Sequence, residues 1–120
     1  SLHDFQEKDK FEVTLTCEAE QMPLELDLVT ALGIIVTEIT SNAYLHAFPT
    51  GPGAIQVKLI QKDSTGILTI SDDGVGFVQQ DESKRHGIGL IKRLMEQVKG
   101  TAALTTNKGT TWTLAFPYSI

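Results

Sequence analysis

The sequence predicts an α+β fold with two layers: a mixed, mainly antiparallel sheet and helices on one of its faces. Five short segments either alternate apolar with polar residues or are rich in β-branched residues, as strands are, and two longer segments repeat apolar residues with a helical period. The order is strand, long helix, hairpin, loop, helix, hairpin. Most strands are therefore neighbours in sequence, which favours antiparallel pairing.

The bulk properties indicate one globular domain over residues 1–120, with 41% hydrophobic and 21% charged residues. No apolar run is long enough to span a bilayer and the first ten residues are polar, so we expect a cytoplasmic chain. The net charge of −5 argues against nucleic acid or an anionic membrane as the main partner. The single cysteine, Cys17, cannot form an internal disulfide, and we expect it to be a small core side chain.

The first half of the chain predicts one strand and one long helix. Residues 11–18 alternate apolar and polar side chains, which indicates a strand. Asp27 is the expected N-cap of a helix over residues 28–48, which Pro49 and Gly51 end.

The second half predicts two hairpins separated by a helix. The four strands are expected at residues 54–61, 66–71, 101–106 and 110–117. The helix is expected over residues 87–100, with Gly100 as the C′ residue that ends it.

Three polar residues interrupt the long helix in the stretch TEITSNAYLHAF, residues 37–48. Glu38, Asn42 and His46 are spaced four apart, so they share one side of the helix. Asn42 falls inside the apolar arc, roughly 40° around the helix axis from Glu38. A polar group near a core needs a partner or costs about 1–3 kcal/mol. Each residue alone also fits an ordinary structural role: a backbone-bonded asparagine, a helix-edge charge and a packed or capping histidine.

A glycine-rich loop, SDDGVGF, follows the strand at residues 66–71. Asp72, Gly74 and Gly76 allow a flat ligand to approach the backbone closely, and the carboxylate can accept a hydrogen bond from an amino group such as that of adenine. The same letters also fit a tight turn.

Two further glycine motifs occur at the expected start of the second helix and before the last strand. Gly87 and Gly89, in HGIGL, would expose backbone amides at a helix N-terminus, which is an anion site. Gly109 and Thr110 precede the last strand in what is otherwise a hairpin turn. The sequence contains neither GxxxxGK[ST] nor a GxGxxG after its first strand, so a P-loop or dinucleotide fold is unsupported.

Taken in order, these motifs resemble the N, G1 and G2 boxes of the GHKL ATPase superfamily, and most closely the catalytic and ATP-binding domain of sensor histidine kinases with a short ATP lid. The resemblance covers about residues 31–117 and implies the Bergerat α/β sandwich, with ATP and Mg²⁺ as cofactors.

The resemblance also assigns roles. Asp72 would accept from the adenine amino group and Thr110 would support the adenine through its hydroxyl or a water. Asn42 would hold Mg²⁺ through its amide oxygen. Glu38 would be the catalytic residue, as a general base or by orienting the metal or the acceptor, and His46 would touch a phosphate. The glycines that would shape the walls and the phosphate path are Gly74, Gly76, Gly87 and Gly89.

One residue departs from the family pattern, because Leu45 stands where related N boxes carry a lysine directed at the phosphates. We expect Lys84 and Arg85 to supply the missing positive charge. These two residues lie in the polar segment 77–86, which would be the ATP lid.

The resemblance implies a histidine kinase that transfers the γ-phosphoryl group of ATP to a histidine on a separate dimerisation domain. We therefore expect residues 1–120 to be one domain of a longer kinase, a homodimer that acts on a response regulator and whose parent can be membrane-anchored. Two alternatives stay open: a protein serine kinase of the anti-sigma-factor type, and a degenerate nucleotide-binding module that acts through interactions.

Overall fold

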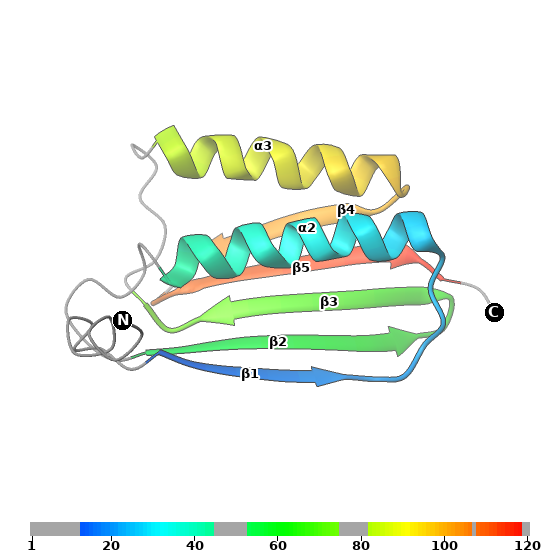
Figure 1. Cartoon of the computed structure of the whole chain (residues 1–120), viewed down its shortest axis with the longest axis horizontal. Coiled ribbons are helices and arrows are strands. Elements are labelled where there is room, and N and C mark those ends of the chain that lie inside the picture. Colours follow the sequence, from blue (N-terminus) through cyan, green and yellow to red (C-terminus); the bar gives the residue numbers. More distant parts are fainter. Residues whose placement is uncertain (1–12, 45–52, 75–81, 107, 119–120) are drawn as a thin grey trace, which may run out of the picture.

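The computed structural model describes residues 13–44, 53–74, 82–106 and 108–118, without the side chains of 82–86. The elements are β1 (Val13–Ala19), α2 (Leu26–Asn42), β2 (Gly53–Lys62), β3 (Thr65–Asp72), α3 (Glu82–Gln97), β4 (Thr101–Thr106) and β5 (Thr110–Pro117). The strands form one sheet in the order β1-β2-β3-β5-β4 (Figure 1). β1 and β2 are parallel and the other three pairs are antiparallel, which confirms the predicted mixed, mainly antiparallel sheet.

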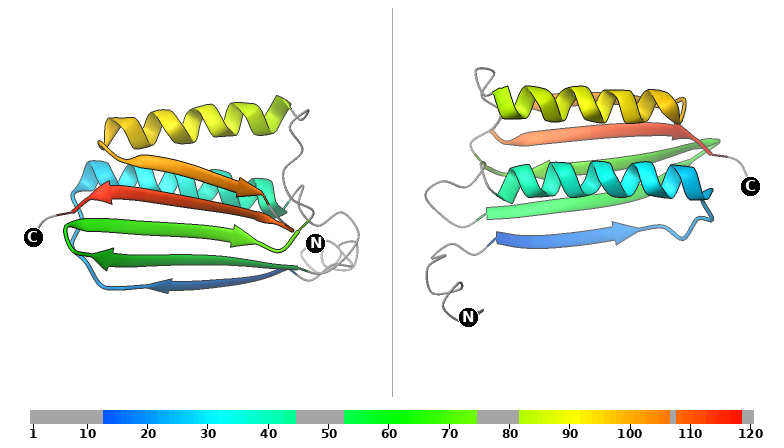
Figure 2. Two further views of the ribbon diagram at one scale, coloured as in Figure 1. Left: turned by 180° about the vertical axis from the view of Figure 1, so that it is seen from behind. Right: turned by 45° about the horizontal axis from the view of Figure 1, so that its top comes forward.

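Both helices cover the same face of the sheet, which confirms the two-layer prediction. Figure 2 shows α3 over β4 and β5, α2 over the middle strands, and β1 at the sheet edge beyond both helices. This leaves β1 with little cover: residues 14–19 are all exposed, whereas alternate residues of β3 and β5 are buried. The strands that the helices cover therefore carry the core.

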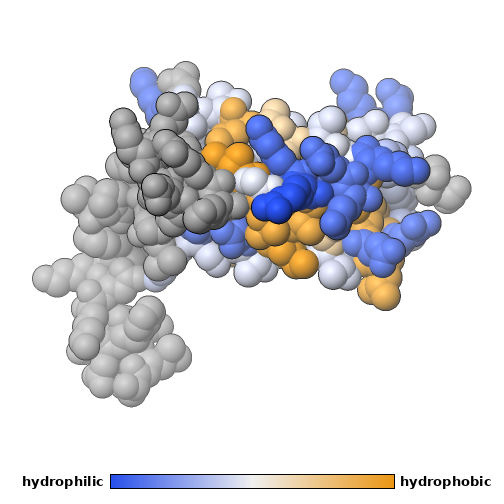
Figure 3. Space-filling view, turned by 90° about the horizontal axis from the view of Figure 1, so that it is seen from above, coloured by the Kyte–Doolittle hydropathy of each residue, from blue (hydrophilic) through white to orange (hydrophobic). Residues whose placement is uncertain are grey.

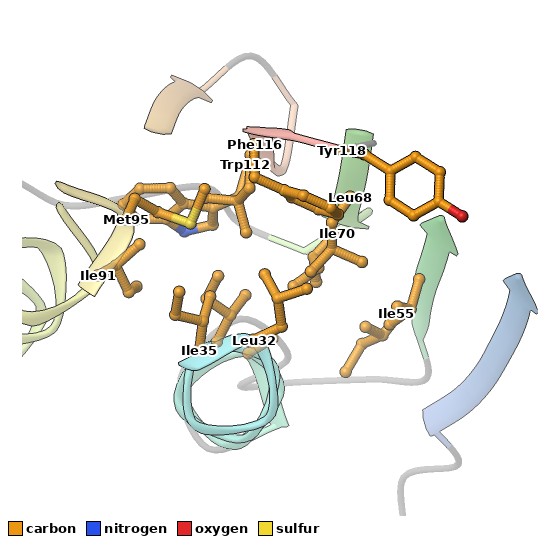
Figure 4. Packing of buried hydrophobic residues seen from close by; sticks show 14 residues of the cluster. Leu32, Ile35, Ile55, Leu68, Ile70, Ile91, Met95, Trp112, Phe116 and Tyr118 are labelled. Atoms are coloured by element: carbon orange, nitrogen blue, oxygen red, sulfur yellow. The ribbon is translucent and has the colours of Figure 1, made fainter. Parts of the chain in front are cut away.

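The core lies between the helices and the middle of the sheet. α2 contributes Ile35 and α3 contributes Met95, both with no exposed surface (Figure 4). Strand β5 contributes Trp112, Leu114 and Phe116, each spaced by two residues so that all face the helices. Burying one such large apolar side chain stabilises a fold by about 1.5–3 kcal/mol. The hydrophobic patterns that predicted the elements thus also supply the packing between the layers.

α2 begins slightly earlier than expected. Its N-cap is Glu25, in an extended conformation and without a side-chain capping bond, so the prediction of Asp27 as the N-cap is wrong. Asp27 lies in the first helical turn, where a carboxylate still interacts favourably with the helix dipole. The expected end of this helix, near residue 48, lies outside the described residues.

α3 begins at Glu82, five residues before the expected start at Gly87. The prediction took the first glycine as the boundary, but Glu, Lys and Arg are better helix formers than Gly, so residues 82–86 extend the helix toward the N-terminus. Lys84 and Arg85 consequently lie in the first turn of α3 and not in a loop. The rest of the expected lid, residues 77–81, lies outside the described residues.

The end of α3 is a Schellman motif displaced by one residue from the prediction. Lys99, with φ of 60°, is the C′ residue, and its N–H donates to the carbonyl of Glu96 at 3.0 Å. Gly100 is the next residue, and its N–H donates to the carbonyl of Met95 at 2.7 Å. Gly100 is needed for space, since an added Cβ would lie 2.4 Å from the carbonyl oxygen of Ala115.

The prediction that Cys17 is a core side chain is wrong, because it is exposed. Cys17 pairs with Val57 across the β1–β2 ladder, and Val57 is buried. The two side chains share a face of the sheet, but no described helix extends over β1. The alternation of apolar and polar residues therefore predicted which face of β1 Cys17 lies on. It did not predict whether a helix covers that face.

The remaining strand predictions agree closely with the structure. β4 and β5 have the expected bounds, and β2 and β3 extend the expected ranges by one residue at each end. Among the described residues, no helix is both long enough and apolar enough to cross a bilayer.

Candidate functional site

The candidate site lies at one end of the sandwich. Figure 1 shows that α2 and β3 end there, and that α3 and β5 begin there. The motifs around Asn42, Asp72, Gly87 and Thr110 are far apart in sequence, and the topology brings them to this common end. The segments that carry the motifs thus lie at one end of the sandwich.

Asp72 and Thr110 form the last pair of the β3–β5 ladder. The preceding inward-facing pair is Ile70 with Trp112, and both are buried under the helices. Because side chains alternate along strands, Asp72 and Thr110 face the same side as that pair. The Asp72 Oδ1 accepts a hydrogen bond from the Gly74 N–H at 3.0 Å, which orients the carboxylate. The structure therefore sets a carboxylate and a hydroxyl residue side by side at the rim of the apolar core.

Gly109 contacts Asp72 more closely than a hairpin turn requires. It has φ of 132°, and an added Cβ would lie 2.2 Å from the carbonyl oxygen of Asp72. Only glycine fits both the conformation and the space. The sequence analysis placed Gly109 in a hairpin turn and gave it no role at the site. Its position directly before Thr110 was the available signal, because Gly109 allows the start of β5 to pack against Asp72.

Asp73 is a supporting residue that the sequence reasoning did not single out. Its Oδ1 accepts a hydrogen bond from the Ala54 N–H at 2.8 Å, and its own N–H donates to the Ala54 carbonyl at 3.3 Å. These bonds tie the loop after β3 to the start of β2. The adjacent aspartates thus have separate tasks: Asp72 faces the helices, and Asp73 anchors the loop.

Glu38 and Asn42 form a pair on the last turns of α2. Asn42 Nδ2 donates to Glu38 Oε1 at 3.2 Å, and both side chains are half-buried. The partner of Asn42 is thus a carboxylate and not a backbone group. Since its NH₂ group faces Glu38, its Oδ1 is the atom that can accept a donor or a cation.

Gly87 of α3 packs directly on this pair. An added Cβ would lie 3.1 Å from Asn42 Nδ2 and 3.2 Å from Glu38 Oε1. Because α3 begins at Glu82, the prediction that Gly87 and Gly89 lie at the N-terminus of this helix is wrong. Gly87 instead lets α3 approach the polar pair of α2. Gly89 lies farther along α3, where its carbonyl accepts from Arg93 Nε at 3.4 Å.

Glu38 and Asn42 could hold a hard cation only if further oxygen ligands came from a bound molecule or from water. The described residues contain no cluster of three or more His, Cys, Asp or Glu side chains able to hold a metal ion. Asn42 Oδ1 and the carboxylate of Glu38 are oxygen donors of the kind Mg²⁺ prefers, and Mg²⁺ commonly completes its shell with phosphate and water oxygens. The residues present therefore fit a magnesium–nucleotide complex and not an isolated metal site.

Several predicted site residues cannot be placed. His46 and Gly76 lie outside the described residues, as does Leu45, and for Lys84 and Arg85 only the helical backbone is described. The structure brings together Glu38, Asn42, Gly87 and, on the same end of the sandwich, Asp72, Gly74 and Thr110.

Comparisons with known proteins agree with this geometry. The family model described as "Histidine kinase-, DNA gyrase B-, and HSP90-like ATPase" matches residues 27–120. Anti-sigma F factors of Geobacillus sp. strain WCH70 and of Geobacillus kaustophilus are each 28% identical to this chain over 113 residues, covering 82% of this chain and 76% of theirs.

Solved structures share the fold. The histidine kinase domain of the Erythrobacter litoralis blue-light activated kinase EL346 superposes with a TM-score of 0.81 at 19% identity, over 93% of this chain and 54% of that one. The Acinetobacter baumannii histidine kinase AdeS superposes with a TM-score of 0.75 at 16% identity, over 99% of this chain and 61% of that one. This chain thus spans just over half of each of these kinase structures.

Proposed function

The chain belongs to the histidine kinase-, DNA gyrase B- and HSP90-like ATPase family, and we propose that it binds MgATP at this end of the sandwich and transfers the γ-phosphoryl group to a histidine on a separate dimerisation domain. One observation carries the proposal: the ladder pair Asp72–Thr110 and the α2 pair Glu38–Asn42, packed on Gly87, lie at the same end of the fold. In this proposal the first pair would bind the base of the nucleotide, and the second pair would act at its phosphates.

Asp72 and Thr110 would bind the adenine. A carboxylate accepts a hydrogen bond from the exocyclic amino group, and the hydroxyl of Thr110 would support the ring directly or through water. Gly74 and Gly76 would leave room for the flat base. The bond from Gly74 N–H to Asp72 Oδ1 supports this role because it fixes the acceptor before the nucleotide arrives.

Asn42 would bind the metal through Oδ1, and Gly87 and Gly89 would border the phosphate path. Bound Mg²⁺ would neutralise charge that develops on the phosphates. His46, Lys84 and Arg85 would donate to phosphate oxygens, the last two in place of the lysine that Leu45 replaces. Neutralising both, as Lys84→Gln with Arg85→Gln, should weaken triphosphate binding more than adenosine binding, and equal effects would contradict this role.

In the transfer step, the bond from the γ-phosphorus to the bridging oxygen breaks and ADP leaves with that electron pair. A neutral imidazole attacks with the lone pair of one ring nitrogen, forming a P–N bond. Glu38 would accept a hydrogen bond from the other ring N–H and so orient the acceptor. Its Oε1 is held by Asn42, which supports a positioning function for the carboxylate.

A protein serine kinase is the second candidate, favoured by the similarity to anti-sigma F factors. In that reaction Glu38 would take the proton of the serine hydroxyl as the γ-phosphoryl group is transferred to its oxygen. The histidine reaction implies two partners, a phosphoacceptor domain and a downstream response regulator. It also implies that this chain is part of a homodimeric cytoplasmic kinase.

Calorimetric titration of MgATP and MgADP into the chain tests the site. We expect both nucleotides to bind, Asp72→Asn to abolish binding of both, and Asn42→Ala to remove the dependence on Mg²⁺. If the folded chain binds neither nucleotide at millimolar concentration, the site is degenerate and the interaction-module alternative replaces the kinase.

The identity of the acceptor is tested separately. Phosphorylated acceptor protein, made with this chain and radiolabelled ATP, is treated with acid or alkali. Phosphohistidine is lost in acid and stable in alkali, whereas phosphoserine shows the opposite pattern, so an acid-stable label would replace the histidine reaction with the serine reaction.

A further inference from the structure

An apolar surface lies on the side of the molecule away from α3. Among the large apolar side chains that the structure leaves exposed, Leu15 of β1 is 59% exposed, and Leu26 and Val29 of α2 are 78% and 47% exposed. Tyr44, just after α2, is 42% exposed. Leu26, Gly33 and Tyr44 are spaced by seven and eleven residues, close to whole helical turns, so they follow one side of the helix. We call Leu15, Leu26, Val29, Gly33 and Tyr44 the α2–β1 face.

A hollow lies at one end of this face, where β1 meets the last turn of α2. It has a volume of about 520 Å³ and is lined by Val13, Leu15, Thr40, Ser41, Tyr44 and Ile55. It exists because α2 covers the middle strands while no described helix covers β1 (Figure 2). The edge of the sheet and the end of α2 therefore form two walls of this hollow.

Two threonines along this flank of α2 have hydroxyl groups that are already hydrogen-bonded to the helix backbone. Thr30 Oγ1 donates to the carbonyl of Leu26 at 2.9 Å, and Thr40 Oγ1 donates to the carbonyl of Val36 at 2.7 Å. Because each hydroxyl already donates its proton to a helix carbonyl, the threonines need no hydrogen-bond acceptor from a partner.

Packing among the described residues does not explain Gly33. An added Cβ would meet no atom within 4 Å, whereas at Gly66, Gly87, Gly100 and Gly109 it would meet neighbours at 3.1 Å or less. Glycine inside a helix is destabilising relative to alanine, so contacts among the described residues give no structural benefit from glycine at this exposed position. Close approach of another element to α2 would explain it.

The exposed charges at the Leu26 end of the face are acidic. Between Val13 and Tyr44 the sequence contains no lysine or arginine, and its five acidic residues are Glu18, Glu20, Glu25, Asp27 and Glu38. Glu20 and Glu25 are exposed on the turn from β1 to α2, and Asp27 is exposed in the first turn of α2. Glu18 lies in β1 opposite Lys58 and faces the other side of the sheet. α3 differs, because Lys92, Arg93 and Glu96 are exposed on it, and hydrophilic side chains gather on the side of the molecule seen from above (Figure 3).

We propose that the α2–β1 face is a docking site for an amphipathic helix of a partner protein, with an apolar stripe flanked by lysine or arginine. The α2–β1 face runs along α2 and ends in the hollow beside β1. A partner helix, parallel or antiparallel to α2, would bury its apolar stripe on Leu15, Val29 and Tyr44 and pass closely over Gly33. Basic flanks match the acidic turn. A second copy of this chain is the poorer occupant, because it would bring the same acidic residues together.

Two labelled peptides of about 18 residues, long enough to span α2, test the docking site by fluorescence anisotropy with the full chain. One is a Leu/Lys peptide with helical period, and the other contains the same residues scrambled. We expect the ordered peptide to bind at least tenfold more tightly than the scrambled one, and a Leu/Glu peptide of the same pattern not to bind.

Matched variants separate the face from general charge attraction. Val29→Lys and Ala103→Lys each add one positive charge at an exposed position, the second on β4 at the opposite sheet edge. Val29→Lys should weaken binding of the ordered peptide at least tenfold, and Ala103→Lys should weaken it less than twofold. Gly33→Leu should weaken binding of the ordered peptide as much as Val29→Lys does. Its melting temperature should stay the same or rise, which excludes unfolding as the cause.

Three results would overturn the proposal: equal binding of the ordered and scrambled peptides, equal effects of the two lysine variants, or self-association in sedimentation that Val29→Lys alone abolishes. The last would assign the face to a second copy. MgATP titration of Val29→Lys should match the unmodified chain, so this proposal and the proposed nucleotide site fail independently.

Discussion

The two ends of the sandwich use glycine for the same physical reason but against different neighbours. At the end where β3 begins and α3 ends, a Cβ on Gly66 would lie 2.2 Å from the ring of Phe116, and one on Gly100 would lie 2.4 Å from the Ala115 carbonyl. At the opposite end, Gly87 contacts Asn42 and Glu38, and Gly109 contacts the Asp72 backbone.

The difference shows how a close approach acquires a function. Around Gly66 and Gly100 the neighbours are an aromatic ring, a methionine and a backbone carbonyl, so the approach only completes the packing. Around Gly87 the neighbours are an amide and a carboxylate, and there the approach leaves polar groups next to one another at the edge of the core. Substitutions at one end should therefore change stability, and at the other end ligand binding.

The largest expected effect is at the polar end. Asp72→Asn should weaken MgATP binding by at least about 100-fold, or about 2.8 kcal/mol, because an amide NH₂ would face the adenine amino group. The melting temperature should stay within about 2 °C, since the asparagine oxygen can still accept from Gly74 N–H. Calorimetric titration and thermal unfolding measure the two quantities, and a large fall in melting temperature would contradict the assignment to binding.

The next effect is at the apolar end. Gly100→Ala should lower the free energy of unfolding by about 1–3 kcal/mol, because the added methyl group overlaps a backbone carbonyl that cannot rotate away. Denaturant titration measures the loss. MgATP affinity of the folded variant should be unchanged, and a coupled loss of affinity would remove the distinction between the two ends.

A smaller effect is expected at Gly87. Gly87→Ala should weaken MgATP binding about tenfold, or about 1.4 kcal/mol, because its Cβ would displace the Asn42 and Glu38 side chains by a few tenths of an ångström. Stability should change little, as the gain in helix propensity offsets the crowding. Unaltered affinity in a Gly87→Ala titration would show that the Glu38–Asn42 pair does not contact the nucleotide.

The smallest effect, and the only favourable one, is expected at Gly33, which belongs to neither end. Gly33→Ala should raise the free energy of unfolding by about 0.5–1 kcal/mol, because the methyl group enters open space and alanine is the better helix former. Denaturant titration checks this. Destabilisation would mean that Gly33 has a contact within the chain and would remove one support for the docking site.

The sequence by itself determined the elements, their order and the two-layer class. Apolar periodicity separated the buried residues of α2, such as Ile35 and Ile39, from the exposed Thr37 and Ser41. The bounds of β4 and β5 followed from alternation and the turn between them. It also singled out Asn42, because a polar group at the edge of a core needs a partner, and Glu38, which shares a helix side with it. Asp72 was identified by the glycine-rich loop that it opens, and Thr110 by the family resemblance.

Only the tertiary structure decided what those residues meet. Local periodicity cannot show which strand lies at an uncovered edge, so Cys17 was expected in the core and is exposed. It also cannot show that α3 begins before its glycines, so that Gly87 lies inside the helix and packs on Asn42 and does not lie at the helix N-terminus. The pairing of Asp72 with Thr110 comes from the β3–β5 register. These relations depend on contacts between segments distant in the chain, and side-chain patterns within one segment do not encode them.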